Sequence, residues 1–396
     1  MADYKDAADV AARLQPHHPV FCARPQAAGA AARVFLEQFP GETFYAVKAN
    51  PAPWLLRSLY EAGVRRFEVA SINEVRLIAS LFTDADIALM NPVKPEEAIA
   101  EAYHRHGVRI FALDTVSEIE KILRATGDAT DLTLCLRHAV SGEGAQISLT
   151  RKYGIDGDDA VGLLQRMRAR ARRLGVAFHV GSQAMGPAAF AAAMDAVERT
   201  IVRAGVIVDV LNVGGGFPCA YPGMTPPPLS AYFDVIRDRF ETMLVTENCA
   251  LWCEPGRALC ADAASLLVRV EGRKGDDLYI NDGAYGALFD AAHLNWPFPA
   301  RAVGAGGVAT GDTAPFSFYG PTCDDLDHMA GPFTLPADIG VGAYIEIGRL
   351  GAYGEAMATR FNGVGGPYKT VHVADAADAH LTTATQEEDE EARYGF

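Results

Sequence analysis

The chain of 396 residues is long enough to bury a large core and predicts two domains. Hydrophobic residues make up 49% and charged residues 21%, which is the composition of an ordinary soluble globular enzyme. The formal net charge of -15 argues against nucleic acid and anionic membranes as partners and is compatible with a cationic substrate. Part of that charge lies in the run Gln386–Glu391, within an expected solvated tail at residues 381–396.

The N-terminal segment and the cysteines predict a cytoplasmic protein. Residues 1–18 carry Asp3, Asp6 and Asp9 and have no apolar signal core, and no stretch approaches a membrane span. Seven cysteines are scattered through the chain without the spacing to histidine that is typical of zinc sites. An odd number of cysteines in apolar segments fits a reducing compartment. We therefore expect no metal and no membrane partner.

From Thr43 onward, short apolar runs alternate with helical patterns, which is typical of parallel strands joined by crossover helices. Eight such units within about 215 residues match a closed (β/α)8 TIM-like barrel. A doubly wound open sheet is the alternative, but no glycine fingerprint follows the first strand. The predicted strands are Thr43–Val47, Val64–Val69, Asp86–Met90, Val108–Leu113, Leu132–Arg137, Val176–Val180, Val208–Val213 and Ala250–Cys253. The predicted helices include Ile72–Leu81, Pro95–His106, Ser117–Ala125 and Ala160–Leu174, the last with a solvent-facing row of Arg166, Arg168, Arg170, Arg172 and Arg173.

After Gly256 the sequence changes to strand-like runs joined by loops rich in glycine, proline and aspartate, which predicts a β-rich C-terminal domain. The predicted strands are Ala264–Val270, Asp277–Ile280, Ala300–Val303, Phe316–Tyr319, Ala343–Ile347 and Lys369–Val373. The segment Pro19–Cys22 is expected to join this domain. We therefore expect an α/β barrel at residues 25–255 and a β-rich domain at residues 256–380 together with residues 1–24.

Residue types suited to catalysis follow the predicted barrel strands, which is where barrel enzymes place their active sites. They are Lys48 after strand one, Arg137 and His179 at the ends of strands five and six, Asn212-Val-Gly-Gly-Gly-Phe-Pro218 after strand seven and Glu254-Pro-Gly-Arg257 after strand eight. A desolvated lysine has a lowered pKa, and its neutral amine is the form that condenses with an aldehyde. Taken alone, Lys48 would more often be a strand-end lysine that reaches solvent, and the residues that accompany it further along the chain favour the functional interpretation.

A lysine, a glycine loop and a carboxylate at one rim together predict pyridoxal phosphate as cofactor. Gly214–Gly216 can wrap a phosphate because no Cβ obstructs their N–H groups, although a lone glycine triplet is more often a plain turn. Lys48 would hold the aldehyde, and Glu254 would pair with the protonated pyridine nitrogen and make the ring an electron sink. His179 has a flat ring suited to stacking on the cofactor, and a packed histidine at a strand end is the alternative.

These motifs, in this order, resemble the fold-type III pyridoxal phosphate decarboxylases, which have an alanine racemase-like barrel, and most closely their ornithine decarboxylase branch. The most specific motif is Tyr319-Gly-Pro-Thr-Cys-Asp-Asp-Leu-Asp327. The resemblance implies that Cys323 protonates the substrate carbon after CO2 leaves and that Asp324 recognises the distal amine, both in the active site of the neighbouring subunit of a homodimer. Asp290, in Tyr285-Gly-Ala-Leu-Phe-Asp290, matches a second carboxylate for that amine.

The resemblance also implies roles for further positions. The positions at which the family contacts the cofactor phosphate correspond to Ser182, Arg257 and Tyr353, and its other cofactor contacts correspond to Glu68 and Arg137. Glu74 corresponds to a carboxylate that the family places near the lysine at Lys48. Lys152 and Asp327 correspond to a salt bridge across the dimer.

Three positions depart from the family pattern. Glu68 stands where aspartate is usual and keeps the charge on a longer arm. Val364, in Phe361-Asn-Gly-Val364, stands where an aromatic residue commonly contacts the site. Gln183 after His-Val-Gly-Ser is similar to the diaminopimelate decarboxylase branch. The last two positions bear on the length and shape of the substrate.

The resemblance predicts a homodimeric cytoplasmic decarboxylase that converts L-ornithine to putrescine for polyamine biosynthesis and also accepts lysine. The alternatives within the class are decarboxylation of lysine, arginine or meso-diaminopimelate, and racemase-like chemistry fits the residues less well. Diaminopimelate would need a cation for its second carboxylate, whereas this sequence supplies Asp290 and Asp324. A non-catalytic carrier of pyridoxal phosphate is the alternative from another class, but carriers of this type are single barrels without a second domain.

Overall fold

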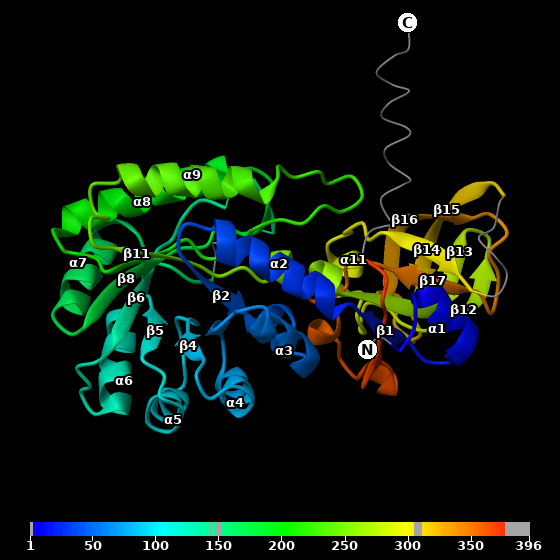
Figure 1. The fold of residues 1–396 in the computed structure, drawn as a ribbon, viewed down its shortest axis with the longest axis horizontal. Helices are drawn as coiled ribbons and strands as arrows, with labels where there is room; N and C mark the ends of the chain where they lie inside the picture. The colour runs from blue at the N-terminus through cyan, green and yellow to red at the C-terminus, as the bar shows by residue number, and fades with distance from the viewer. Residues whose placement is uncertain (1–2, 143, 148–151, 305–310, 377–396) are drawn as a thin grey trace, which may run out of the picture. The chain divides into compact units, whose positions relative to one another are not determined.

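The computed structural model describes residues 3–142, 144–147, 152–304 and 311–376, and the chain divides into two compact units (Figure 1). The barrel unit comprises residues 31–219 and 226–258. The β unit comprises the described parts of residues 1–30, 220–225 and 259–396. The acidic run Gln386–Glu391 lies outside the described residues.

The barrel unit contains eight parallel strands that pair in a closed ring, so the predicted (β/α)8 barrel is confirmed. Their order around the ring is β10-β11-β2-β3-β4-β5-β6-β8. They are β2 (Glu42–Ala46), β3 (Arg66–Val69), β4 (Asp86–Leu89), β5 (Ile110–Leu113), β6 (Thr133–Arg137), β8 (Arg173–Ala177), β10 (Val210–Asn212) and β11 (Ala250–Cys253). Strands covered on both faces read as continuous apolar runs, which is why these segments were recognisable in the sequence.

Side chains fill the barrel interior. The rings of Phe44 and Trp252 lie 4.8 Å apart between their centroids. They pack with small residues of the facing strands, namely Ala88, Ala112, Cys135, Ala177 and Val210. At Gly175 an added Cβ would lie 2.6 Å from the Cys135 sulfur, so this part of the interior has no room for a side chain.

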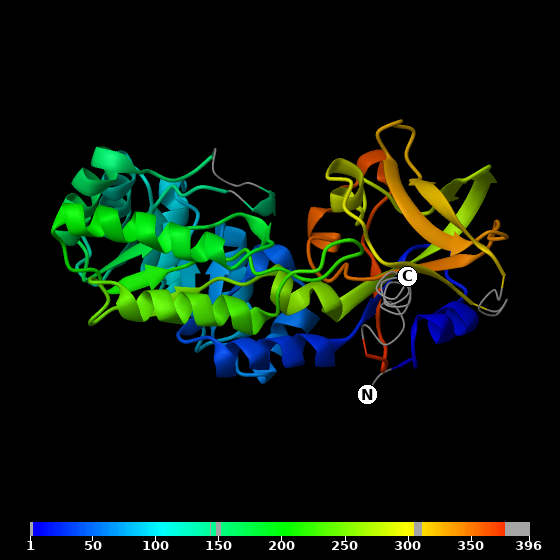
Figure 2. The ribbon, with the colours of Figure 1, turned by 90° about the horizontal axis from the view of Figure 1, so that it is seen from above.

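Helices follow the strands and form the outside of the barrel unit; α8 and α9 run next to each other along it (Figures 1 and 2). The helices are α2 (Pro25–Gln38), α3 (Pro53–Glu61), α4 (Ile72–Leu81), α5 (Glu96–His106), α6 (Val116–Thr126), α7 (Gly157–Arg168), α8 (Ala188–Ala204) and α9 (Leu229–Thr242). In addition, β7 (Ala145–Ile147) pairs with β9 (Ser182–Ala184) in a small two-stranded sheet.

A capping box begins α4. The Ser71 hydroxyl accepts a hydrogen bond from the Glu74 N–H at 3.3 Å, and Glu74 Oε2 in return accepts from the Ala70 N–H at 2.6 Å. Burial raises the pKa of Glu74, and the charge of Glu68 acts in the same direction. The carboxylate expected near Lys48 therefore also has a structural task, which is to begin the helix after β3.

The predicted helix Ala160–Leu174 is wrong at its C-terminal end, because α7 ends at Arg168 and β8 begins at Arg173. Arginines two residues apart do not share one helical face, since neighbours on a helix surface are three or four residues apart. The Arg168 side chain pairs with Asp209 at 2.6 Å, and the Arg173 guanidinium lies over the Trp252 ring. The earlier start of β8 places His179 two residues beyond the strand.

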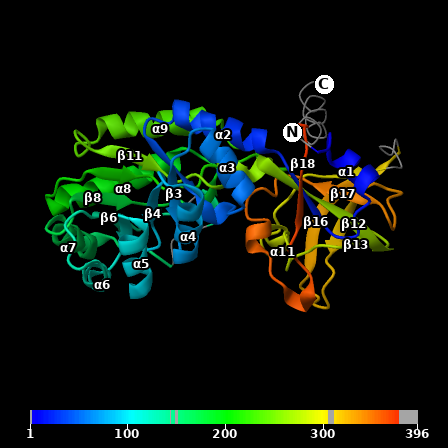
Figure 3. The same ribbon diagram turned by 60° about the horizontal axis from the view of Figure 1, so that its bottom comes forward.

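The β unit is built on an eight-stranded mixed sheet (Figure 3). Its elements are α1 (Ala7–Leu14), β1 (Val20–Ala23), α10 (Arg257–Cys260), β12 (Ala264–Lys274), β13 (Asp277–Ile280), α11 (Phe289–His293), β14 (Ala300–Val303), β15 (Thr313–Tyr319), β16 (His328–Pro336), β17 (Tyr344–Ile347) and β18 (Lys369–His372). β1 pairs with β12 and β18, so the expected contribution of Pro19–Cys22 is confirmed. β16 was not predicted, because Gly331 and Pro332 interrupt its strand pattern.

A buried ionic network joins the ends of several strands of the β unit. The fully buried Glu346 carboxylate accepts from the Arg24 guanidinium at 2.8 Å and from the Ser265 hydroxyl at 2.6 Å. Its other oxygen pairs with Arg301 at 2.6 Å, and Arg24 also binds Asp375 through two nitrogens. Burial alone would raise the pKa of Glu346, but the charges of Arg24 and Arg301 hold it below its ordinary value.

We predict that Glu346→Gln destabilises the protein by about 3 kcal/mol, because it removes the buried counter-charge shared by the buried Arg24 and the half-buried Arg301, while Arg24 keeps its pair with Asp375. Because the pKa of Glu346 is lower in the folded protein than its unfolded value of 4.5, its contribution to the free energy of unfolding is full above pH 4.5. This contribution is lost as the pH falls through the folded pKa. The difference between wild type and variant in urea unfolding should therefore be full at pH 7 and shrink below pH 4.5. Arg124→Gln, which breaks an exposed pair with Glu96, is the control and should cost at most about 1 kcal/mol. A variant as stable as this control at pH 7 would contradict the prediction.

Candidate active site

Lys48 lies in the short turn Val47–Ala49, directly after β2 at the C-terminal mouth of the barrel. Its Nζ is 2.9 Å from Glu68 Oε2, and the pairing of Ala46 with Glu68 in the neighbouring strand β3 explains this proximity. The Lys48 side chain is 41% exposed, whereas the Glu68 carboxylate is buried. Lys48 is therefore ion-paired and accessible from solvent, and not the desolvated amine that the buried strand suggested.

Glu254 follows β11 and is buried at the same mouth. Asn212, at the end of β10, donates from Nδ2 to Glu254 Oε1 at 2.6 Å. Burial raises the pKa of Glu254 to about 7, the nearby charge of Glu68 adds to this effect, and the charge of Lys48 opposes it. The site thus holds two carboxylates close enough to repel each other.

His179 lies in the loop after β8, and its Nδ1 accepts a hydrogen bond from the Gly181 N–H at 3.0 Å. Burial lowers the pKa of His179 well below its usual value, and the charges of Arg137 and Lys48 lower it further. The ring is therefore neutral, with its proton on Nε2. Burial also lowers the pKa of Arg137, against the opposing charges of Glu254 and Glu68.

The loop Gly214–Gly216 packs directly on the backbone of the neighbouring segments. A Cβ on Gly214 would lie 2.1 Å from the Phe178 carbonyl oxygen, and one on Gly216 would lie 2.3 Å from that of Gly181. A Cβ on Gly215 would lie 2.6 Å from the Glu254 carbonyl oxygen and 3.3 Å from His179 Nε2. Gly214 and Gly216 also have positive φ angles of 69° and 99°. This close approach requires glycine at all three positions.

The far end of the glycine loop is held by Gln183, whose side chain is fully buried. Gln183 Nε2 donates to the Cys219 carbonyl, and Gln183 Oε1 accepts from the Cys219 N–H at 3.0 Å. The Ala184 N–H donates to the Gly216 carbonyl at 2.9 Å. Both polar groups of the Gln183 side chain thus bind the backbone after the loop. The bearing of Gln183 on substrate length and shape stays a prediction.

The other predicted site residues are divided between the two units. Ser182 begins β9, and the buried Arg257 begins α10 with its carbonyl accepting from the Cys219 thiol at 3.5 Å. These residues belong to the barrel unit together with Lys48, Glu68, Arg137, His179, Gly214, Gly215, Gly216 and Glu254. The β unit contains Tyr353, Asp290, Cys323 and Asp324.

Within the β unit, Cys323 is exposed, and its N–H donates to Asn362 Oδ1 at 3.0 Å. Asp324 accepts hydrogen bonds from the Tyr285 hydroxyl and, at 3.0 Å, from the Leu326 N–H. These two bonds lower the pKa of Asp324, so it is ionised at neutral pH. Asp290 is mostly buried in the first turn of α11.

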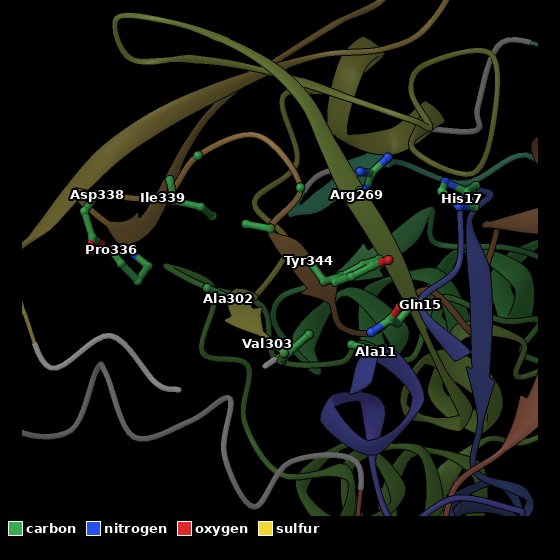
Figure 4. Close-up of a pocket in the computed structure, with 14 residues that line it drawn as sticks. Ala11, Gln15, His17, Arg269, Ala302, Val303, Pro336, Asp338, Ile339 and Tyr344 are labelled. Atoms are coloured by element: carbon green, nitrogen blue, oxygen red, sulfur yellow. The ribbon is translucent and has the colours of Figure 1, made fainter. Parts of the chain in front are cut away.

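Cavities of the β unit differ in whether predicted site residues line them. Cys323 and Asp324 border one of about 690 Å³, whose wall includes the stacked rings of Tyr279 and Tyr319. Another, of about 520 Å³, lies beside Tyr344, Arg269 and Gln15, and none of the predicted site residues lines it (Figure 4). Chemistry is therefore expected at the first cavity and at the barrel mouth.

Two possible features are absent from the part of the chain that the structure describes. None of its helices has both the length and the apolar character that crossing a bilayer requires. No group of three or more histidine, cysteine, aspartate or glutamate side chains is arranged to hold a metal ion.

The residues at the barrel mouth fit pyridoxal phosphate. The accessible amine of Lys48 suits its aldehyde, and the backbone of a loop without side chains suits its phosphate. Burial raises the pKa of Glu254, and a protonated ring nitrogen next to it would favour its ionised form. A closed parallel barrel with these groups at its C-terminal mouth defines the class of barrel enzymes that bind pyridoxal phosphate.

The chain belongs to the pyridoxal-dependent decarboxylases, because residues 28–261 match the pyridoxal-binding domain of that family. It is therefore a decarboxylase that uses pyridoxal phosphate, and it acts on an amino acid. It is 32% identical over 329 residues to the lysine/ornithine decarboxylase of Selenomonas ruminantium, covering 81% of this chain and 80% of that protein. It is also 32% identical over 350 residues to the ornithine decarboxylase of Schizosaccharomyces pombe, covering 81% and 76%.

Solved structures agree with this assignment. Lysine decarboxylase from Selenomonas ruminantium superimposes with a TM-score of 0.78 at 26% identity, covering 99% of this chain and 100% of that chain. Lysine/ornithine decarboxylase from Vibrio vulnificus, complexed with putrescine, also gives a TM-score of 0.78 at 26% identity, covering 93% and 99%.

Sequence reasoning missed the role of Asn212. Its Oδ1 accepts from the Gly214 N–H at 2.9 Å while its Nδ2 holds Glu254, so one amide joins the phosphate-type loop to the buried carboxylate. A signal was present, because asparagine at the end of a buried strand, two residues before a glycine, is typical of side chains that bind the next turn.

We predict that Asn212→Asp weakens uptake of pyridoxal phosphate by the apoprotein at pH 7.5 by at least about tenfold. The variant replaces a hydrogen-bond donor to Glu254 with a like charge in a buried site, and a bond to a charged group is worth about 1.5–3 kcal/mol. Equilibrium titration followed by cofactor absorbance measures the effect. Asn281→Asp, in the β unit, is the control. Equal uptake by the two variants would show that the bond to Glu254 is unimportant.

Proposed function

We propose that the protein is a homodimeric, cytoplasmic L-ornithine decarboxylase that releases putrescine for polyamine biosynthesis, with lysine as a second substrate that gives cadaverine. The observation that carries the proposal is the ionised Asp324 next to the exposed thiol of Cys323, since a carboxylate in this position suits a distal ammonium. The relatives named as lysine/ornithine and ornithine decarboxylases support it, as does the putrescine in the Vibrio vulnificus structure.

In this proposal the domain at residues 25–255 holds the cofactor. Lys48 would hold its aldehyde, the glycine loop its phosphate and Glu254 its ring nitrogen, and the neutral ring of His179 would contact its ring. Further contacts come from Glu68, Arg137, Ser182, Arg257 and Tyr353. When bound, pyridoxal phosphate supplies an electron sink for the pair left behind when CO2 departs.

Cys323 completes the reaction. After the bond between Cα and the carboxylate breaks, the thiol gives its proton to Cα, and the resulting thiolate takes a proton from solvent. The exposed position of Cys323 in its own chain supports action in the active site of a neighbouring subunit. The two active sites of a homodimer would then be shared.

Substrate choice follows from charge. A distal ammonium loses its water on entering the pocket, which is tolerable only against a paired carboxylate. Asp324 and Asp290 offer this pairing to ornithine and lysine. The second carboxylate of meso-diaminopimelate would instead meet like charge, and arginine would place a larger guanidinium at the same point.

We predict that Asp290→Asn lowers kcat/KM for ornithine by at least about tenfold, since a charged hydrogen-bonded contact is worth about 1.5–3 kcal/mol. Lysine should remain a slower substrate, because one methylene discriminates by only about 1–3 kcal/mol. CO2 release from a panel of ornithine, lysine, arginine and meso-diaminopimelate measures both expectations. Asp325→Asn, at an exposed position next to Asp324, is the control. Faster turnover of diaminopimelate than of either diamino acid would overturn the proposed substrate class.

We further predict that mixing inactive Lys48→Ala with inactive Cys323→Ala restores about a quarter of the wild-type sites, because random pairing in a two-fold dimer makes half of the dimers mixed, each with one complete site. Activity after subunit exchange measures the recovery, and exchange is verified with differently tagged chains. No recovery in verified mixed dimers would place both residues in the site of one chain.

A further inference from the structure

Asp327, the last residue of the Cys323 motif, is only 1% exposed, and the backbone folds around its carboxylate. Oδ1 accepts from the Ala284 N–H at 2.7 Å. Oδ2 accepts from the Thr322 N–H at 3.0 Å and from the Thr322 hydroxyl at 2.7 Å. The Asp327 backbone also accepts from the Gly320 N–H and donates to the Asp324 carbonyl. One carboxylate therefore binds two separate loops, which we name the Cys323 loop (Gly320–Asp327) and the Tyr285 turn (Gly283–Ala287).

Both loops approach this carboxylate so closely that only glycine fits beside it. A Cβ on Gly283 would lie 2.1 Å from Asp327 Oδ1. A Cβ on Gly320 would lie 2.1 Å from the same oxygen and 2.4 Å from Oδ2. Neither loop can shift against Asp327 without losing these contacts.

The Tyr285 turn is bound at its other end by a second buried aspartate. Asp282 accepts from the Ala287 N–H at 3.2 Å and from the Tyr368 hydroxyl. The turn held in this way presents the Tyr285 hydroxyl to Asp324. The Cys323 loop and the Tyr285 turn are thus joined twice, through the buried carboxylate of Asp327 and through the bond from Tyr285 to Asp324.

This arrangement adds a role within one chain to the one expected for Asp327. Its two oxygens accept three hydrogen bonds, from the Ala284 N–H and from the Thr322 N–H and hydroxyl. The expected salt bridge between Lys152 and Asp327 across a dimer stays a prediction.

We propose that Asp327 is a positioning residue of the decarboxylase, which fixes the Cys323 loop to the Tyr285 turn and thereby sets where the Cys323 thiol and the Asp324 carboxylate stand. The inference rests on the proposed function of Cys323 and Asp324. In this role Asp327 touches neither substrate nor cofactor. It acts through Cys323 and Asp324, which contact the substrate in the proposed function.

The test is Asp327→Asn in the full-length holoenzyme, with Asp276→Asn, at an exposed position in the turn between β12 and β13, as the matched control. The asparagine amide keeps the shape but places a donor against the Thr322 donors or against the Ala284 N–H, so one loop must move. We expect kcat/KM for ornithine to fall about a hundredfold, with kcat falling as well as KM rising, and the control to stay within about twofold of wild type. Cofactor content and absorbance should be unchanged, because the proposed cofactor contacts are concentrated in the barrel unit.

Two readouts separate positioning from a general loss of structure. The bond from Tyr285 lowers the pKa of Asp324, so displacement of the loop should move the acidic limb of the kcat/KM profile to higher pH. Mixing Asp327→Asn with Lys48→Ala should restore about a quarter of the sites, whereas mixing it with Cys323→Ala should restore none, because both changes then damage the same loop. Gly320→Ala should reproduce both results, since its Cβ enters the space of the carboxylate.

The outcomes are distinguishable. If Asp324→Asn is impaired while Asp327→Asn behaves like the Asp276→Asn control, the positioning role is overturned and the proposed function stands. If Asp327→Asn loses its cofactor or fails to complement Lys48→Ala, its role is general folding and the proposal is again overturned. If Asp324→Asn and Cys323→Ala both retain wild-type activity, the proposed function fails, and the positioning role fails with it.

Discussion

Two carboxylates, Glu68 and Glu254, are buried at the mouth of the barrel, close enough for their charges to repel each other. The structure around them depends on how this repulsion is offset. Burial of like charges is costly unless each one is paired. Lys48 pairs with Glu68, while Glu254 receives only the neutral amide of Asn212 and the more distant charges of Lys48 and Arg137. Burial and the charge of Glu68 raise the pKa of Glu254 to about 7, and a cation bound next to it would favour its ionised form. The protonated ring nitrogen of the cofactor is a cation of this kind.

The glycine loop depends on the same group of residues. Asn212 binds Glu254 with one end of its amide and the Gly214 N–H with the other, so the carboxylate and the loop are held in a fixed relation. Gln183 performs a comparable task at the far end of the loop through Cys219. Two side-chain amides thus fix a loop that has no side chains of its own between Gly214 and Gly216. Neutral amides suit this task, because each provides a donor and an acceptor without adding charge to a crowded site.

Features encoded by neighbouring residues could be predicted from the sequence. The bounds of α4 at Ile72–Leu81 and of β11 at Ala250–Cys253 were correct, because a capping serine begins the first and a short apolar run defines the second. The boundary between α7 and β8 was missed, since the arginines around it suit either element. The contacts of Gln183 with Cys219 and of Asp327 with Ala284 join residues 36 and 43 positions apart, and no local pattern encodes them. Candidate residues such as Lys48 and Glu254 were therefore recognisable, whereas the contacts by which Gln183 and Asp327 hold the glycine loop and the Cys323 loop were not.

The two units differ in how they hold their functional groups. In the barrel unit, strand ends and close backbone contacts fix Lys48, Glu254 and the glycine loop, so the geometry follows from the closed sheet itself. In the β unit, Cys323 and Asp324 lie on a loop whose position depends on one buried carboxylate and one tyrosine hydroxyl. A few substitutions around that carboxylate could move the loop without disturbing the barrel. Under the proposed function, the cofactor site is therefore the more constrained part, and substrate preference is the property that substitutions on the Cys323 loop can change at small structural cost.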